Sequence, residues 1–205
     1  AISCWDLEMP LCVNTDMVAP GDIRSWDDLL APRWRGKVLL EARGLALAIL
    51  MRKWGEEQTL AYIARLKDNR PVVLLGGSPA AEALASGRVA VAIGTYSSKI
   101  DLMRKAGAPV DWLTVSPIPS IVYVMLVAEG CANPNAARLW AAWIAGPGAA
   151  AAYETTHFGL VHGQRLSPNG RKMRDAEAEI VLEEPDPGVS QARLARVAAA
   201  IGALG

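Results

Sequence analysis

Three short polar segments of this sequence combine residue types that can bind a small ligand. Each segment follows an apolar run typical of a buried strand and precedes a predicted helix. In open parallel sheets, loops of this kind meet at the carboxyl ends of the strands, where helix N-termini offer free N–H groups. We therefore predict one ligand-binding site, formed by these residues: Glu41 and Arg43 from the first segment, Gly77 and Ser78 from the second, and Thr95, Tyr96 and Ser97 from the third.

Each segment also has a plain structural interpretation. Arg43 could form a two-pronged hydrogen bond with a carboxylate or phosphate, or it could be a solvated surface charge. The segment at 76–78 could be an anion-binding loop, although glycine pairs before helices are more often turns. The segment at 95–97 could provide a helix cap and a tyrosine packed against the core. The predicted site therefore depends on the convergence of all three segments.

Catalytic and metal-binding sites have weaker support in the sequence. His157 and His162 lie five residues apart in a predicted loop, but no third metal ligand has a suitable spacing. Neither histidine lies near the three segments, so a nucleophile there would lack a base. Cys4 and Cys12 could form a disulfide, or these two and Cys131 could be small buried hydrophobic residues. The spacing of the cysteines resembles no zinc or iron–sulfur site.

The composition favours a globular protein in which any charge-based recognition is local. Of the 205 residues, 52% are hydrophobic, and 21 basic residues balance 21 acidic ones. This balance provides no overall field that would attract nucleic acid or an anionic membrane, so we expect neither as a partner. No segment is long and apolar enough to span a membrane, and we expect no membrane insertion. The start of the chain lacks the pattern of a signal peptide, which would have been removed if the protein is exported.

The predicted elements place the three segments in an α/β fold. Predicted strands and helices alternate from residue 37 to residue 115, which implies a mostly parallel sheet with helices on both sides. The strands are expected at residues 9–14, 37–41, 72–75, 89–93 and 110–115, and the helices at 25–30, 45–54, 56–69, 80–85 and 97–106. Beyond these we expect an apolar strand at 120–128, helices at 135–145 and 148–155, charged helix or extended structure up to 182, and a last helix at 190–201.

The segment SWDDLLAPRWRGKVLLE, at residues 25–41, is the most specific motif of the chain. Ser25 is a good helix N-cap, and Asp27 and Asp28 suit the positive end of the helix dipole. Pro32 ends the short helix. This motif resembles the entry into the second lobe of periplasmic (type II) solute-binding proteins of ABC transporters, in the iron(III)-binding-protein-like subgroup. Four further segments resemble the same family in the same order: VNTDMV at 13–18, WGEEQTLAYIARLK at 54–67, residues 85–112 and residues 133–153.

The resemblance implies a type II periplasmic-binding-protein-like fold, with a mixed, mostly parallel sheet flanked by helices. The second lobe would be complete and the first lobe partial, because the opening part of the first lobe is lacking. The implied organisation is a first-lobe remnant and hinge strand at 1–18, the second α/β lobe at 19–117, a hinge return strand at 118–128 and the C-terminal helical part of the first lobe at 129–205. Helices at 134–155 would then expose an apolar face, which a homodimer through the incomplete first lobe would cover.

The resemblance also implies a function. The chain would be the solute-binding component of an ABC importer, exported to the periplasm or the cell exterior, with an ABC permease as partner and no enzymatic activity. A small ligand, an organic anion or ferric iron, would bind between two lobes that close by hinge bending. The alternatives are a ligand-sensing domain of a regulator and an enzyme on the same fold.

One position bears on the choice between an organic anion and ferric iron. Iron-binding members of this family usually present two adjacent tyrosines where this chain has Thr95 and Tyr96. Ferric iron prefers hard anionic oxygen ligands, and a single phenolate leaves its coordination short. Tyr96 would therefore be a metal ligand only if the solute is iron, whereas hydroxyl groups at a helix start suit an organic solute better. We expect no resident cofactor.

Overall fold

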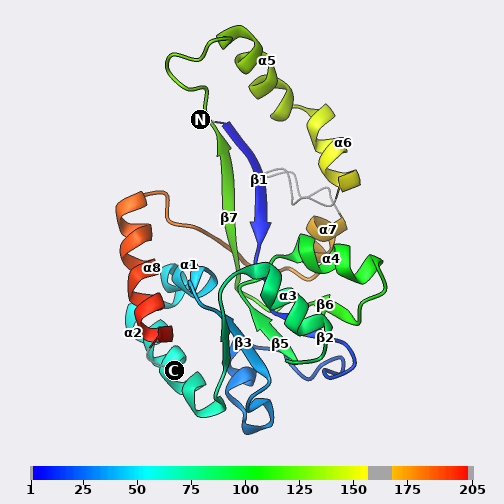
Figure 1. Cartoon of the computed structure of the whole chain (residues 1–205), viewed down its shortest axis with the longest axis vertical. Helices are drawn as coiled ribbons and strands as arrows, with labels where there is room; N and C mark the ends of the chain where they lie inside the picture. The colour runs from blue at the N-terminus through cyan, green and yellow to red at the C-terminus, as the bar shows by residue number, and fades with distance from the viewer. Residues whose placement is uncertain (1, 157–167, 203–205) are drawn as a thin grey trace.

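The structure is a computed structural model that describes residues 2–156 and 168–202. Its strands form two sheets, a five-stranded sheet in the order β4-β3-β5-β2-β6 and a three-stranded sheet in the order β1-β7-β8 (Figure 1). The strands of the five-stranded sheet are β2 (Cys12–Asn14), β3 (Val38–Glu41), β4 (Val72–Leu74), β5 (Val91–Ile93) and β6 (Val110–Trp112).

The five-stranded sheet is mixed, as predicted. Strand β3 pairs in parallel with β4 and with β5, while β2 runs antiparallel to β5 and to β6. Leu39 and Leu40, neighbours on β3, belong to different apolar clusters because successive side chains of a strand point to opposite faces. Helices therefore cover both faces of the sheet, and the predicted α/β architecture is confirmed.

The helices of the chain begin and end close to the predicted residues. They are α1 (Leu45–Trp54), α2 (Glu56–Leu66), α3 (Gly77–Ala85), α4 (Ser97–Lys105), α5 (Pro134–Ile144), α6 (Pro147–Thr156), α7 (Pro168–Asp175) and α8 (Pro187–Gly202). Short 3-10 helices are η1 (Trp26–Leu30), η2 (Pro32–Trp34) and η3 (Lys67–Asn69). Among the described residues, no helix has the length and apolarity that a membrane span requires.

The helix start at Ser25 has the predicted cap. The Ser25 Oγ accepts a hydrogen bond from the Asp28 N–H at 3.3 Å, and the Asp28 carboxylate accepts one from the Ser25 N–H at 2.9 Å. This reciprocal arrangement satisfies two backbone donors at once. The helix that follows, η1, is a 3-10 helix, and Pro32 begins the next one.

The three-stranded sheet consists of β1 (Ile2–Glu8), β7 (Ile118–Met125) and β8 (Ile180–Leu182). Strands β1 and β7 pair in an antiparallel ladder and project together away from the five-stranded sheet (Figure 1). Strand β8 pairs in parallel with the first residues of β7. The strand predicted at 9–14 is confirmed over residues 12–14 only, as β2, because Pro10 lies between β1 and β2 and has no N–H for a ladder.

The last two helices, in the stretch 129–205 that we assigned to the first lobe, contact the apolar clusters on the two faces of the five-stranded sheet. Helix α8 packs beside α1, where Val197 and Ile201 join the same apolar cluster as Leu47 (Figure 1). Met173 of α7 lies in the cluster on the other face of the five-stranded sheet. Apolar packing therefore returns the chain to the five-stranded sheet after α6. The domain boundaries themselves stay a prediction.

Helix α5 exposes apolar side chains, as the sequence led us to expect. Leu139 is 73% exposed, Trp140 53% and Trp143 44%, and the two indole rings stack at a centroid distance of 4.9 Å. Only Ala141 and Ile144 of this helix are buried. This exposed side of α5 is large enough to favour a contact with another apolar surface.

Candidate functional site

The three predicted segments meet at one end of the five-stranded sheet. Glu41 is the last residue of β3, Gly77 begins α3, and Thr95 lies between β5 and α4. The Gly76 N–H donates a hydrogen bond to Glu41 Oε1 at 2.9 Å, and the Thr95 Oγ1 donates to the Gly77 carbonyl oxygen at 3.0 Å. These two bonds tie the three segments together, in the place where parallel strands direct their loops.

Glycine allows the strand ends to approach closely. Gly94 has a φ of +97°, a conformation that other residues rarely adopt, and a Cβ atom there would lie 2.6 Å from the Cβ of Glu41. A Cβ atom on Gly77 would lie 3.5 Å from the Gly94 carbonyl oxygen. Any side chain at Gly94 would therefore push Glu41 out of its position.

Glu41 and Arg43 form an ion pair at the edge of the site. The Arg43 Nε donates to Glu41 Oε1 at 2.9 Å, and this bond raises the pKa of the guanidinium. Glu41 is buried, whereas the Arg43 side chain is 54% exposed. Within the described part of the chain, no further hydrogen bond involves the Arg43 guanidinium. Its two Nη groups can therefore donate to a ligand.

Tyr96 is half-buried at the start of α4. Burial raises the pKa of its phenol, the nearby Tyr123 adds to this effect, and the positive charge of Arg43 opposes it. Tyr123 belongs to β7 and stacks on Trp5 with ring centroids 5.2 Å apart. The sequence analysis missed Tyr123, because its place in an apolar strand gave no sign of a polar role.

Ser97 contacts a buried acid that the sequence analysis also missed. The Ser97 Oγ donates to Glu8 Oε2 at 2.9 Å. Glu8 ends β1 and is only 1% exposed, and burial raises its pKa to about 7 although the bond from Ser97 opposes this shift. Glu8 Oε1 and the Ser120 Oγ are buried and have no hydrogen-bond partner among the described residues. A single acid in the predicted first-lobe remnant and hinge strand at 1–18 gave no signal of this contact.

The structure brings together all but one of the predicted site residues. Ser78 lies exposed on the first turn of α3, and no hydrogen bond of its side chain is found among residues 2–156 and 168–202. The others form one connected group: Glu41, Arg43, Gly77, Thr95, Tyr96 and Ser97. Their role in ligand binding stays a prediction.

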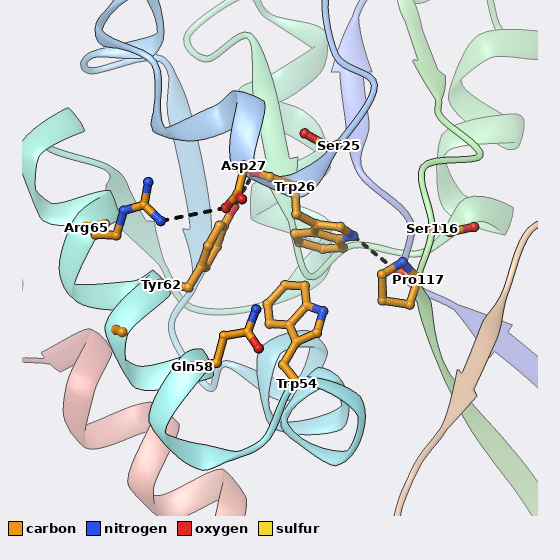
Figure 2. Close-up of a pocket in the computed structure, with 10 residues that line it drawn as sticks. Ser25, Trp26, Asp27, Trp54, Gln58, Tyr62, Arg65, Ser116 and Pro117 are labelled. Carbon is orange, nitrogen blue, oxygen red and sulfur yellow. Dashed lines mark hydrogen bonds and ion pairs between the residues drawn. The ribbon is translucent and has the colours of Figure 1, made fainter.

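A pocket of about 230 Å³ lies elsewhere, between η1, α2 and the residues that precede β7 (Figure 2). The Trp26, Trp54 and Tyr62 rings pack at its wall with centroids 5.3 to 6.4 Å apart. The Trp26 Nε1–H donates to the Pro117 carbonyl oxygen at 3.0 Å, and the Tyr62 hydroxyl donates to the Trp26 carbonyl oxygen at 2.8 Å. We call these rings and Pro117 the aromatic junction.

The aromatic junction stabilises the connection between the helices and β7. Its buried N–H and hydroxyl groups already have protein partners, and burial raises the pKa of Tyr62. At the rim, Arg65 and Asp27 lie 3.9 Å apart and are both largely exposed (Figure 2). The aromatic rings therefore pack as part of the core, and we do not place the ligand here.

Other candidate sites have no structural support. No group of three or more histidine, cysteine, aspartate or glutamate residues within the described ranges could hold a metal ion. His157 and His162 lie outside the described residues. Cys12 is a buried free thiol whose pKa is raised by burial, and Cys131 is also free. The disulfide considered between Cys4 and Cys12 is therefore wrong.

Several solved structures share this architecture. An ABC transporter substrate-binding protein from Bradyrhizobium japonicum USDA 110 is 16% identical with a TM-score of 0.74, over 97% of this chain and 69% of that one. The substrate-binding protein of an ABC transporter from Agrobacterium tumefaciens is 12% identical with a TM-score of 0.72, over 98% and 66%. Apo FutA2 from Synechocystis PCC6803 is 20% identical with a TM-score of 0.67, over 99% and 70%. At these identities the similarity establishes the fold.

The chain spans 66 to 70% of the length of these three proteins. A search of curated proteins gave no significant match. Residues 7–159 match the model of a protein family described as bacterial extracellular solute-binding protein. Because this match covers most of the sequence and the fold agrees with it, the chain belongs to the family of bacterial extracellular solute-binding proteins.

Proposed function

We propose that this chain is the solute-binding component of an ABC importer and that it captures a small organic anion beside Arg43. The observation that carries the proposal is the position of Arg43, whose exposed guanidinium is held by the buried Glu41 next to Tyr96. A guanidinium held in this way can donate two parallel hydrogen bonds to a carboxylate or phosphate. The N–H groups at the starts of α3 and α4 add further donors.

The proposed capture mechanism is closure of two lobes about β1 and β7. These strands form the ladder that projects from the five-stranded sheet (Figure 1). Tyr123 on β7 is close enough to Tyr96 to affect the pKa of its phenol. A solute that contacts both Arg43 and this ladder would stabilise the closed arrangement more than the open one. A periplasmic or extracellular location and an ABC permease as partner follow from the family and belong to the same proposal.

Similar folds carry diverse solutes, so the fold alone does not identify this one. One similar structure is titled a GABA receptor, another a periplasmic thiamin binding protein, and a third a periplasmic binding protein with fructose-6-phosphate bound. Amine and acidic groups both occur among these ligands. The solute class of this chain must therefore be derived from its own side chains.

Ferric iron is the second candidate solute, because the structure brings a second phenol, Tyr123, toward Tyr96. Burial raises the pKa of Tyr96, which makes the phenolate form that iron requires harder to reach. Titration with ferric citrate tests this candidate directly. A visible phenolate-to-iron charge-transfer band that is lost in Tyr96→Phe would favour iron, and we expect no such band.

A homodimer through the exposed side of α5 is a further proposal from the sequence. Leu139, Trp140 and Trp143 would be buried in such a contact. Size-exclusion chromatography with light scattering tests it, because Trp140→Asp should then convert dimers to monomers. A wild-type protein that stays monomeric at high concentration would contradict it.

The experiment that tests the anion proposal is a thermal-shift screen with carboxylates, phosphate esters and phosphonates. Binding to the native state raises the melting temperature by mass action. We expect a rise with at least one class, and a loss of affinity of 10-fold or more in Arg43→Ala. Arg138→Ala is the matched control, because Arg138 is an exposed arginine on α5. Unchanged binding by Arg43→Ala, or no rise with any anion, would contradict the proposal.

A further inference from the structure

Two buried polar atoms lie unpartnered where β1 and β7 approach the head of α4. Glu8 and Ser120 are directly opposite each other in the antiparallel ladder, so their side chains project from the same face. Glu8 is 1% exposed and Ser120 is fully buried. Neither Glu8 Oε1 nor the Ser120 Oγ has a hydrogen-bond partner in the described part of the chain. A buried polar group without a partner costs free energy, so this pair calls for a role.

The pair adjoins the predicted ligand site through Ser97. The other carboxylate oxygen of Glu8, Oε2, accepts the hydrogen bond from the Ser97 Oγ. Ser97 directly follows Tyr96, and the charge of Arg43 acts on the Tyr96 phenol. Ser97 therefore links Glu8 to the start of α4, the same helix start that carries Tyr96, so the acid-binding and the acidic parts of the site adjoin one helix N-terminus.

The chemistry of the pair favours a ligand group that donates hydrogen bonds. A carboxylate oxygen can only accept, and a serine hydroxyl can accept as well as donate. Once ionised, Glu8 repels an acidic solute group, whereas an ammonium group brings three N–H donors and a positive charge that favours the ionised form of Glu8. Arg43 has the opposite charge and acts on the neighbouring Tyr96, so it suits the acidic end of the solute.

We propose that the solute is a zwitterion, an amino acid or a related compound, whose ammonium group is bound by Glu8 Oε1 and the Ser120 Oγ while Arg43 binds its acidic group. This inference rests on the proposed function and adds the amine to it. Both acceptor atoms are covered by protein in this structure, so the amine reaches them as β1 and β7 bend during lobe movement.

The protonation of Glu8 supports this assignment. Burial raises its pKa to about 7, with smaller contributions from the nearby carboxylates of Asp6 and Asp101. An ammonium ion beside the carboxylate would lower this pKa again and favour the charged form. Binding of an amine would therefore offset the free-energy cost of ionising the buried Glu8 carboxylate.

The experiment uses pairs of compounds that differ only in the amine. Aliphatic amino acids with two to four carbons between amine and carboxylate are each compared with the same acid without the amine, and alkylamines form a third arm. Affinities are measured by calorimetry for the wild type, Glu8→Gln and Ser120→Ala. The control is Glu129→Gln, because Glu129 is an exposed acid in the segment after β7.

We expect the wild type to bind an amino acid at least 10-fold more tightly than its deaminated partner. Glu8→Gln should remove this preference while it keeps the affinity for the plain acid, and Ser120→Ala should reduce the preference severalfold. Glu129→Gln should behave as wild type. Ser120→Ala also covers the case in which Glu8→Gln fails to fold, because it removes an acceptor without changing charge.

The outcomes separate this inference from the proposed function. Equal affinity for acids with and without an amine, unaffected by Glu8→Gln, would overturn the amine site and leave the anion proposal standing. Amino-acid binding that depends on Glu8 but is unchanged in Arg43→Ala, measured in the same way, would overturn the anion proposal and the zwitterion with it. Absence of binding in all three arms would overturn the zwitterion, whereas the anion proposal falls only if phosphate esters and phosphonates also fail in the thermal-shift screen.

Discussion

The Glu41 carboxylate lies 2.9 Å from the backbone N–H of Gly76 and accepts its hydrogen bond. This contact joins the end of β3 to the start of α3, and it places a buried negative charge where the helix dipole is positive. Because the same oxygen also accepts the bond from Arg43, one carboxylate positions both the helix start and the guanidinium. The arrangement of the proposed site therefore depends on Glu41 even though Glu41 itself is buried.

Replacement of Glu41 by alanine should destabilise the protein and release Arg43. The Gly76 N–H would lose its acceptor, and a lost hydrogen bond to a charged group costs about 2 kcal/mol. We expect this decrease in the free energy of unfolding by urea denaturation. Glu41→Gln is the control, because the amide oxygen can still accept from Gly76. Equal stability of Glu41→Ala and wild type would contradict the prediction.

Gly94→Ala should be more damaging than a glycine substitution elsewhere with the same backbone strain. Its Cβ atom would lie 2.6 Å from the Cβ of Glu41, and its φ is +97°. We expect a loss of about 3 kcal/mol in the free energy of unfolding, from overlap and strain together. At Gly107 φ is +89° and nothing lies within 4 Å, so Gly107→Ala should lose only about 1 kcal/mol. Similar losses at the two positions would refute the role of close packing.

The raised pKa of Glu8 predicts a specific dependence of stability on pH. The folded protein holds this proton up to a pKa of about 7, whereas the ordinary value is 4.5. Between these pH values the unfolded chain binds fewer protons than the folded protein, so the free energy of unfolding falls as the pH rises. The contribution of Glu8 is fully present below about pH 4.5, declines up to pH 7 and is lost above it.

Urea denaturation of the wild type and Glu8→Gln at several pH values measures this contribution. Glutamine does not titrate, so the difference between the two proteins isolates Glu8. We expect the wild type to lose on the order of 2 to 3 kcal/mol relative to Glu8→Gln between pH 4.5 and pH 8. A difference that stays constant over this range would show that Glu8 titrates normally.

Trp26→Phe should weaken the aromatic junction. The substitution removes the N–H that donates to the Pro117 carbonyl oxygen, and it leaves space in a buried position. We expect a loss of about 2 kcal/mol in the free energy of unfolding. Trp140→Phe is the matched control, because this ring is 53% exposed and should change the stability by less than about 0.5 kcal/mol. An equal effect at both positions would contradict the structural role of the junction.

The sequence alone predicts the parts of the fold that follow from local patterns. Apolar runs locate β3 and β5, the Ser25 cap locates η1, and the order of strands and helices predicts an α/β sheet. The convergence of the three loops follows from the same order, because parallel strands direct their carboxyl ends to one edge. Glu41, Arg43 and Tyr96 could therefore be named as neighbours without any coordinates.

The contacts that the sequence could not predict depend on pairing between distant segments. Glu8 meets Ser97 and Ser120 only because β1 pairs with β7 and approaches α4. The residue patterns around Glu8 and around Ser120 do not indicate that these side chains lie close together. The position of α8 likewise results from apolar packing on α1. Many amphipathic helices could pack on that surface, so the sequence did not identify α8 as the one that does. Long-range register, rather than local propensity, determined what was missed.

Strand β8 supports only the first residues of β7, so the β1–β7 ladder is stiffer at that end than along the rest of its length. From Ile118 to Ser120, β7 is backed by β8, and beyond Ser120 the described residues give it β1 as its only partner. A strand pair that is supported by a third strand over only part of its length bends most easily where that support ends. That end is Ser120, directly opposite Glu8, so a small molecule bound at this pair would lie at the bend itself and would restrain it directly.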